Sequence, residues 1–114
     1  MLESNIFLKI IDKSIDSEIV YEDDQCLAFK DVNPKAPIHV LIIPKKVIKT
    51  HRDITFDDRL LIGHLNYVAT LLARKLNLND GYRLVVNCES AGGQTVPHLH
   101  MHLLGGRTMN WPPG

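Results

Sequence analysis

Three of the six histidines of this 114-residue chain lie within five residues, at His98, His100 and His102. Successive side chains of a β-strand point to opposite faces, so the three imidazoles would share one face and the apolar residues between them the other. An imidazole is largely uncharged near neutral pH and can act as a nucleophile or as a general acid or base. The spacing therefore predicts a strand with one buried face and one face that can do chemistry.

Alternating imidazoles allow three interpretations. They can converge on one zinc ion, which takes three or four N, O or S ligands. They can act without a metal, or they can be ordinary polar residues of a half-exposed strand. On spacing alone the metal and the metal-free chemistry are equally favoured, with a structural role behind both. Gly92 and Gly93 favour a phosphate cradle, because a glycine turn can direct several N–H groups at an anion.

The composition predicts one soluble domain. Thirteen basic and thirteen acidic residues give a formal charge of zero without a basic block, so neither a nucleic-acid groove nor an anionic membrane surface is predicted as a partner. No apolar run approaches the roughly 20 residues that span a bilayer, and the first residues lack a signal pattern. We expect a cytoplasmic location, with the nucleus as an alternative. Cys26 and Cys88 are expected to be buried, reduced thiols.

The periodicities predict an α+β domain in which an antiparallel sheet packs on helices. We expect a short amphipathic helix that starts after Ser4 or Asn5, and a long helix from about Phe56 to Asn77 with Thr55 as its cap. Besides the histidine strand, four strands are expected, at 18–22, 25–31, 38–44 and 82–87. Leu60 and His64 lie on the expected apolar stripe of the long helix, and His64 is expected to be a core or boundary residue. His51 is expected to be solvated.

The residues from His98 to Leu104 read His, apolar, His, apolar, His, apolar, apolar, which resembles the signature of the histidine triad superfamily. Further segments resemble its branch of histidine triad nucleotide-binding proteins: Tyr21–Asp24, Ala28–Phe29, Ala36–Pro37, Ile43–Lys46, Gly92–Gln94 and Trp111–Gly114. The resemblance covers nearly the whole chain, as a single domain over residues 1–114. It implies a five-stranded antiparallel sheet with two helices, and a dimer in which two sheets run on as one ten-stranded sheet.

The resemblance also implies roles for individual residues. His100 is implied as the nucleophile that forms a nucleotidyl-histidine intermediate. One nitrogen of its ring is implied to donate to a backbone carbonyl, which fixes the other nitrogen as the one free to attack. His102 is implied to hydrogen-bond the phosphate oxygens, His98 to support the triad from the side, and His39 to buttress it. Thr95 stands where the family usually carries serine, so the hydroxyl is kept and a methyl group is added.

The resemblance further implies how a substrate is held. Backbone donors of Gly93, Gln94 and Thr95, with the amide of Asn87, would surround the α-phosphate and the leaving group, and Asp31 would bind ribose hydroxyls. From sequence alone, Asp31 is equally well a turn residue. A further set matches apolar residues of the base site or adjoining substrate contacts, although each could equally be core: Ile6, Phe7, Ile10, Phe29, Val32, Leu41 and Val96. Trp111 belongs to a tail that the family places against the partner subunit's active site.

The leading hypothesis is a hydrolase of purine nucleoside phosphoramidates that releases AMP and an amine. The alternative from another class is a nucleotide-binding regulatory or scaffold dimer with incidental hydrolysis, and a histidine-metal hydrolase is a third. Several family members carry Cys-x-x-Cys near the N-terminus as half of a zinc site, but here Asn5 and Leu8 stand at those positions. We therefore predict no structural zinc and no cofactor.

Overall fold

The computed structural model describes residues 5–114, so Ser4 lies outside the described part. Five strands form one antiparallel sheet in the order β1-β2-β3-β5-β4. The elements are α1 (Ile6–Ile11), β1 (Ile19–Glu22), β2 (Cys26–Lys30), β3 (Ile38–Pro44), α2 (Arg59–Lys75), β4 (Tyr82–Val85) and β5 (Met101–Gly105). The predicted antiparallel α+β fold with two α-helices is confirmed. The predicted strand at 82–87 is shorter in the structure, where β4 ends at Val85.

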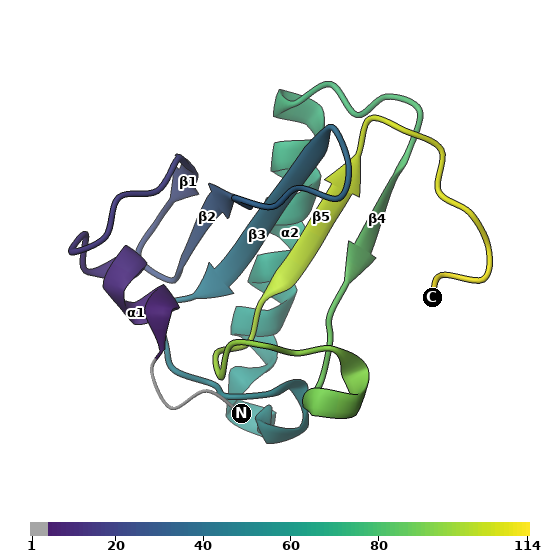
Figure 1. Cartoon of the computed structure of the whole chain (residues 1–114). Helices are drawn as coiled ribbons and strands as arrows, with labels where there is room; N and C mark the ends of the chain where they lie inside the picture. The colour runs from purple at the N-terminus through teal and green to yellow at the C-terminus, as the bar shows by residue number, and fades with distance from the viewer. Residues whose placement is uncertain (1–4) are drawn as a thin grey trace.

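The two helices lie against opposite faces of the sheet (Figure 1). Strand β3 shows the division, because Val40 and Ile42 belong to the buried cluster that includes residues of α2, whereas Leu41 and Ile43 pack with Phe7 of α1. Alternate residues of β2 divide in the same way. A central strand with both faces covered has to be apolar throughout, which explains the nearly continuous apolar run from Ile38 to Pro44.

Helix α2 begins three residues later than expected. Residues Phe56–Asp58 form a 3₁₀ turn, in which the Asp58 carboxylate accepts from both the backbone N–H and the hydroxyl of Thr55. The α-helix then runs from Arg59 to Lys75 and buries Leu65, Val68 and Leu72 among its apolar residues. The expected apolar stripe is narrower than the spacing suggested, because Leu60 is 89% exposed.

Strand β5 also begins later than the alternation predicted. His98 and His100 precede it, and regular pairing with β3 starts at the pair Ile42 and Met101. Pro97 has no N–H to donate, and the N–H of Leu99 donates to the carbonyl of Ile48, beyond the end of β3. The alternation still holds, because Leu99, Met101 and Leu103 are buried on the α2 side. Only His102 of the three histidines therefore lies on a regular strand.

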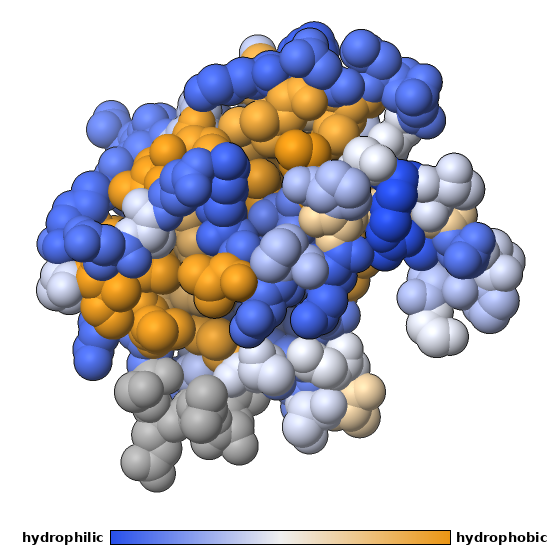
Figure 2. Space-filling view, turned by 45° about the horizontal axis from the view of Figure 1, so that its top comes forward, coloured by the Kyte–Doolittle hydropathy of each residue, from blue (hydrophilic) through white to orange (hydrophobic). Residues whose placement is uncertain are grey.

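Figure 2 shows how side chains of different hydropathy are distributed on one face. Hydrophobic surface gathers on the side of α1, β1 and β2, and more polar residues cover the side where the chain ends. Among the described residues, no helix is both long and apolar enough to cross a bilayer. Cys26 is buried as expected, Cys88 is only half-buried, and both are free thiols.

Candidate active site

His98 is fully buried, and both of its ring nitrogens are engaged. Nε2 lies 2.7 Å from the carbonyl oxygen of Pro44, and Nδ1 lies 2.8 Å from Nδ2 of Asn5. Asn5 caps α1 by accepting the N–H groups of Phe7 and Leu8 at Oδ1, which fixes its amide so that Nδ2 donates to the ring. A carbonyl can only accept, so His98 carries its proton on Nε2. This ring is a neutral structural link between α1 and the end of β3.

His100 has one engaged and one available nitrogen. Nδ1 lies 2.7 Å from the backbone oxygen of His98 and therefore donates to it. In the neutral ring this leaves Nε2 with a lone pair. Within residues 5–114 the fully enclosed side-chain polar atoms without a partner are Ser17 Oγ and His102 Nε2, so Nε2 of His100 keeps contact with solvent. The ring packs edge-on against Phe7, with centroids 5.0 Å apart.

His102 is oriented by a second chain of hydrogen bonds. The backbone N–H of Lys35 donates to Nδ1 of His39, at 3.0 Å, so the proton of the neutral His39 ring lies on Nε2. That nitrogen donates to Nδ1 of His102, at 2.9 Å. His102 therefore carries its own proton on Nε2, which is enclosed and has no acceptor among residues 5–114. The rings of His102 and His100 are neighbours, with centroids 5.0 Å apart, and an unused buried N–H is suited to an anionic oxygen.

The site keeps its imidazoles neutral. Burial lowers the pKa of His39, His98 and His100 below the ordinary histidine value. Burial, together with the neighbouring rings of His100 and His39, lowers the pKa of His102 to about 4. At neutral pH each ring therefore has one donor and one acceptor nitrogen, as the hydrogen bonds require.

The glycine loop, residues 89–96, precedes His98 and contains a positive-φ turn. Only part of this loop can act as an anion cradle. Gly93 has a φ of 91°, which explains why glycine occupies this position. Its N–H donates to the carbonyl of Ser90. The N–H of Gln94 donates to the carbonyl of Glu89. These two backbone groups were expected to face a phosphate and are instead used inside the loop. Among residues 5–114, the N–H of Thr95 has no acceptor.

Comparisons with known proteins identify the family of this chain. The HIT domain family matches residues 12–109. The chain belongs to the HIT domain family. An uncharacterized HIT-like protein of Synechococcus elongatus is 53% identical over the whole of both chains. A protein of Zea mays named 14 kDa zinc-binding protein is 50% identical, with 96% of this chain and 87% of the maize protein covered.

Solved structures of HIT proteins share the fold. A HIT family hydrolase from Legionella pneumophila superposes with a TM-score of 0.95, at 49% identity over 97% of this chain and all of that one. One from Clostridium thermocellum gives a TM-score of 0.92 at 45% identity, with 96% of both chains covered. A histidine triad nucleotide-binding protein from Candida albicans gives 0.81 at 31% identity, with 96% of this chain and 83% of that one covered. Two of these similar proteins are named as hydrolases, and the third is named as a nucleotide-binding protein.

The HIT residues that the sequence assigned to substrate lie in different surroundings. Phe7, Ile10, Phe29 and Leu41 are buried together in the cluster under α1, and Val96 packs against them, whereas Ile6 is partly exposed and Val32 is 89% exposed. Asp31 is half-buried and its Oδ2 lies 3.4 Å from Nε2 of His39, while Oδ1 accepts the N–H of Asn33 in a turn. Asn87 is half-buried beside Gly93. Trp111 is 83% exposed. Their contacts with substrate or partner stay predictions.

Two residue groups of the described HIT domain offer three ligand atoms within 4.8 Å of one another. One comprises Asp31, His39 and His102, where the 2.9 Å hydrogen bond between the rings occupies the two ring nitrogens that face each other. The other comprises Asp23, Cys26 and His64. The three triad histidines do not form such a group within residues 5–114. In addition, both ring nitrogens of His98 are engaged in hydrogen bonds. Convergence of the triad on one metal ion, one of the alternatives allowed by the sequence, is therefore not seen.

His64 lies at the boundary of the core, as predicted, but its partner was not foreseen. Its Nε2 lies 2.6 Å from Oδ2 of Asp23, which also accepts the hydroxyl of Tyr21 at 2.8 Å. Although burial opposes it, the hydrogen bond from His64 and three others hold the pKa of Asp23 well below its usual range. The cluster links the β1–β2 turn to α2. His51 is exposed, as predicted.

Replacing Asn5 with alanine is expected to lower the free energy of unfolding by about 1–3 kcal/mol. The change removes the cap of α1 and leaves Nδ1 of His98 without a donor. Urea titration of Asn5→Ala and Asn5→Asp would measure it. Aspartate keeps the cap but cannot donate to the ring, so Asn5→Asp should also lose stability. Full stability of Asn5→Asp would show that the contact with His98 contributes nothing.

Proposed function

We propose that this protein hydrolyses purine nucleoside phosphoramidates, releasing AMP and an amine through a nucleotidyl-histidine intermediate. The observation that carries the proposal is the tautomer of His100, whose Nδ1–H is held by the carbonyl of His98 while Nε2 keeps its lone pair. A neutral, oriented imidazole with one free nitrogen is suited to attack phosphorus. The similar proteins named HIT family hydrolases support hydrolysis in general.

The proposed first step transfers the nucleotidyl group to the enzyme. Nε2 of His100 attacks the α-phosphorus, a P–N bond forms to the ring, and the P–N bond to the amine breaks. The leaving amine keeps the electron pair of that bond and takes up a proton from water, with the exposed hydroxyl of Thr95 as its hydrogen-bonding neighbour. The enclosed Nε2–H of His102 donates to a phosphate oxygen, on which negative charge increases.

The second step restores the enzyme. Water attacks the phosphorus and releases a proton to the solvent, the bond between phosphorus and His100 breaks, and AMP leaves while the ring regains its lone pair. Asp31 would bind the ribose hydroxyls, and the apolar residues under α1 would adjoin the base. We also propose the homodimer and the cytoplasmic location that the sequence predicted, with Trp111 of one subunit near the site of the other.

The proposal is tested by incubating the purified protein with adenosine 5′-phosphoramidate and following AMP by chromatography. Acid-quenched samples analysed by mass spectrometry should contain protein carrying one AMP group on the peptide with His100. Turnover of phosphoramidates should exceed that of dinucleotides. Tight AMP binding with no turnover of any phosphoramidate would instead support the regulatory or scaffold function.

A further inference from the structure

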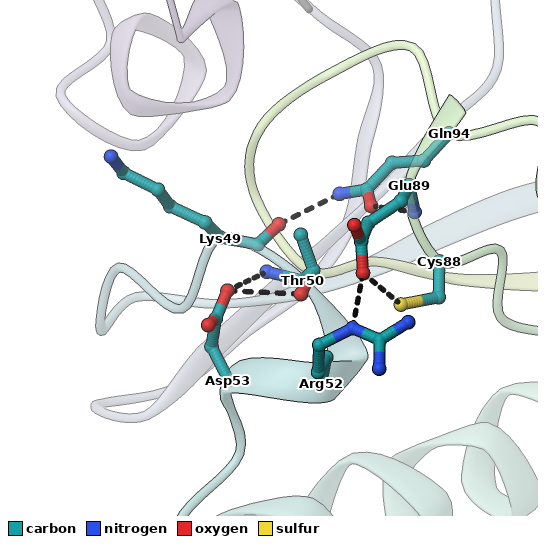
Figure 3. A network of polar contacts seen from close by, with 7 residues as sticks. All are labelled: Lys49, Thr50, Arg52, Asp53, Cys88, Glu89 and Gln94. Atoms are coloured by element: carbon teal, nitrogen blue, oxygen red, sulfur yellow. Dashed lines mark hydrogen bonds and ion pairs between the residues drawn. The ribbon is translucent and has the colours of Figure 1, made fainter. Parts of the chain in front are cut away.

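A series of hydrogen bonds, joined through the covalent structure of Glu89, Gln94 and His98, connects an exposed arginine to His100. The guanidinium of Arg52 donates through Nε to the carboxylate of Glu89, and the backbone N–H of Glu89 donates to Oε1 of Gln94 at 2.8 Å (Figure 3). Nε2 of Gln94 donates to the carbonyl of Val96, at 2.9 Å. The side chains of Arg52, Glu89 and Gln94 therefore hold the glycine loop at both ends, at Glu89 and at Val96.

The chain continues through the backbone into the triad. The carbonyl of Val96 also accepts the N–H of His98, at 2.8 Å, and the carbonyl of His98 accepts Nδ1–H of His100. Gln94 has a second anchor, since Nε2 also donates to the carbonyl of Lys49 at 2.7 Å. The orientation of the His98 carbonyl, which decides the tautomer of His100, thus depends on the path of the loop.

Glu89 lies in an unfavourable backbone conformation at the start of this loop. Its φ of 63° and ψ of −179° fall in a region that is essentially restricted to glycine. The conformation persists because the carbonyl of Glu89 accepts the N–H groups of Gly92 and Gln94, at 3.1 and 3.0 Å, in addition to the contacts of its N–H and carboxylate. A residue held by several contacts in a strained conformation, within a loop that leads into the triad, is typical of a functional constraint.

The ion pair itself offers little stability. The side chains of Arg52 and Glu89 are 76% and 46% exposed, and exposed pairs contribute little to the free energy of unfolding. Arg52 lies in a short 3₁₀ turn whose ends are fixed by Thr50 and Asp53, because the Asp53 carboxylate accepts from the N–H and the hydroxyl of Thr50. The pair therefore fastens the start of the glycine loop to a separately fixed turn.

We propose that Glu89 is a positioning residue for catalysis, which Arg52 and Gln94 hold in its strained conformation so that the glycine loop fixes the tautomer of His100. The inference rests on the proposed role of His100 as nucleophile. Glycine at this position would remove the strain and also the fastening. The side chain is thus expected to favour turnover at the expense of stability.

The test compares Glu89→Gly and Glu89→Gln with a matched control, Glu18→Gln. Glu18 forms an exposed ion pair with Lys30, at the other end of the sheet, with side chains 69% and 49% exposed. Each variant is measured for kcat and KM on adenosine 5′-phosphoramidate, for Tm, and for the ring ¹⁵N shifts of His100 by NMR.

For Glu89→Gly we expect kcat to fall about 10-fold to 100-fold with KM within about 3-fold, while Tm is unchanged or higher. The ¹⁵N shifts should change from a single Nδ1–H tautomer to a mixture. Glu89→Gln should lose kcat with little change in Tm, and Glu18→Gln should match the unmodified protein in all four measurements. A residue that merely stabilises the fold would lower Tm and kcat together.

Wild-type kcat and an unchanged Nδ1–H tautomer in both Glu89 variants would overturn the proposal, and so would a fall in kcat that only follows a fall in Tm. The NMR measurement separates this inference from the proposed function. If the unmodified protein does not hydrolyse phosphoramidates, the proposed function is wrong. The tautomer of His100 in Glu89→Gly still decides whether the loop is positioned by Glu89.

Discussion

Replacing His100 with asparagine is expected to reduce kcat on adenosine 5′-phosphoramidate by at least about 10³-fold and to leave AMP affinity within a few-fold. Asparagine can retain a hydrogen bond to the His98 carbonyl but has no lone pair basic enough to attack phosphorus. The adduct with one AMP group should disappear together with turnover. Steady-state kinetics, calorimetry with AMP and mass spectrometry of quenched samples measure these three effects.

His51→Asn is the matched control, because this histidine is exposed and lies outside the triad. It should keep the kcat of the unmodified protein. If His100→Asn turned over phosphoramidates at the normal rate, His100 would not be the nucleophile. If it lost AMP binding as completely as turnover, the ring would have to be assigned to binding instead.

Acid is expected to destabilise the fold well before the carboxylates protonate. Burial lowers the pKa of His39, His98, His100 and His102 in the folded state, so between about pH 6.5 and 4 the unfolded chain binds more protons. Stability therefore rises with pH through this window and is lost as pH falls. Each histidine can contribute up to about 1.4 kcal/mol per pH unit, and His102 alone on the order of 3 kcal/mol by pH 4.

Urea midpoints at several pH values between 7.5 and 4.5 measure this dependence. His102→Asn removes one depressed group and should have a shallower slope than the unmodified protein. Its fold should also be comparatively more stable at the acidic end of the range. Stability that is flat from pH 7.5 to 4.5 would show that these rings protonate readily in the folded protein.

Much of the fold could be predicted because the local hydrophobic pattern agrees with the burial that each element has in the tertiary structure. The run from Ile38 to Pro44 is apolar on both faces, and β3 has those bounds. Leu60 and the start of β5 were predicted wrongly for a common reason. Whether Leu60 is covered, and where the ladder begins beside Ile48, depend on segments distant in sequence, about which periodicity carries no information.

The site was predictable as a set of histidines but not as a network. The three imidazoles are visible from their spacing, and the buttressing His39 came from the resemblance to the family. The contact of Asn5 with His98 spans 93 positions, and Glu89 is fixed by Arg52, 37 positions away. No motif marks either partner. The backbone of Gly93 and Gln94 was assigned to phosphate from the resemblance to the family, yet those groups stabilise the loop itself.

Between His98 and Leu103, histidines and buried apolar side chains alternate one by one along a single stretch of backbone. Gain or loss of one amino acid there would exchange the two sets, sending imidazoles toward α2 and apolar side chains toward the side of α1 and the active site. Insertions and deletions should therefore be absent from this stretch in homologous proteins that keep the activity. Insertions should accumulate instead at the exposed turn of residues 79–81, where side chains do not have to pack on two faces.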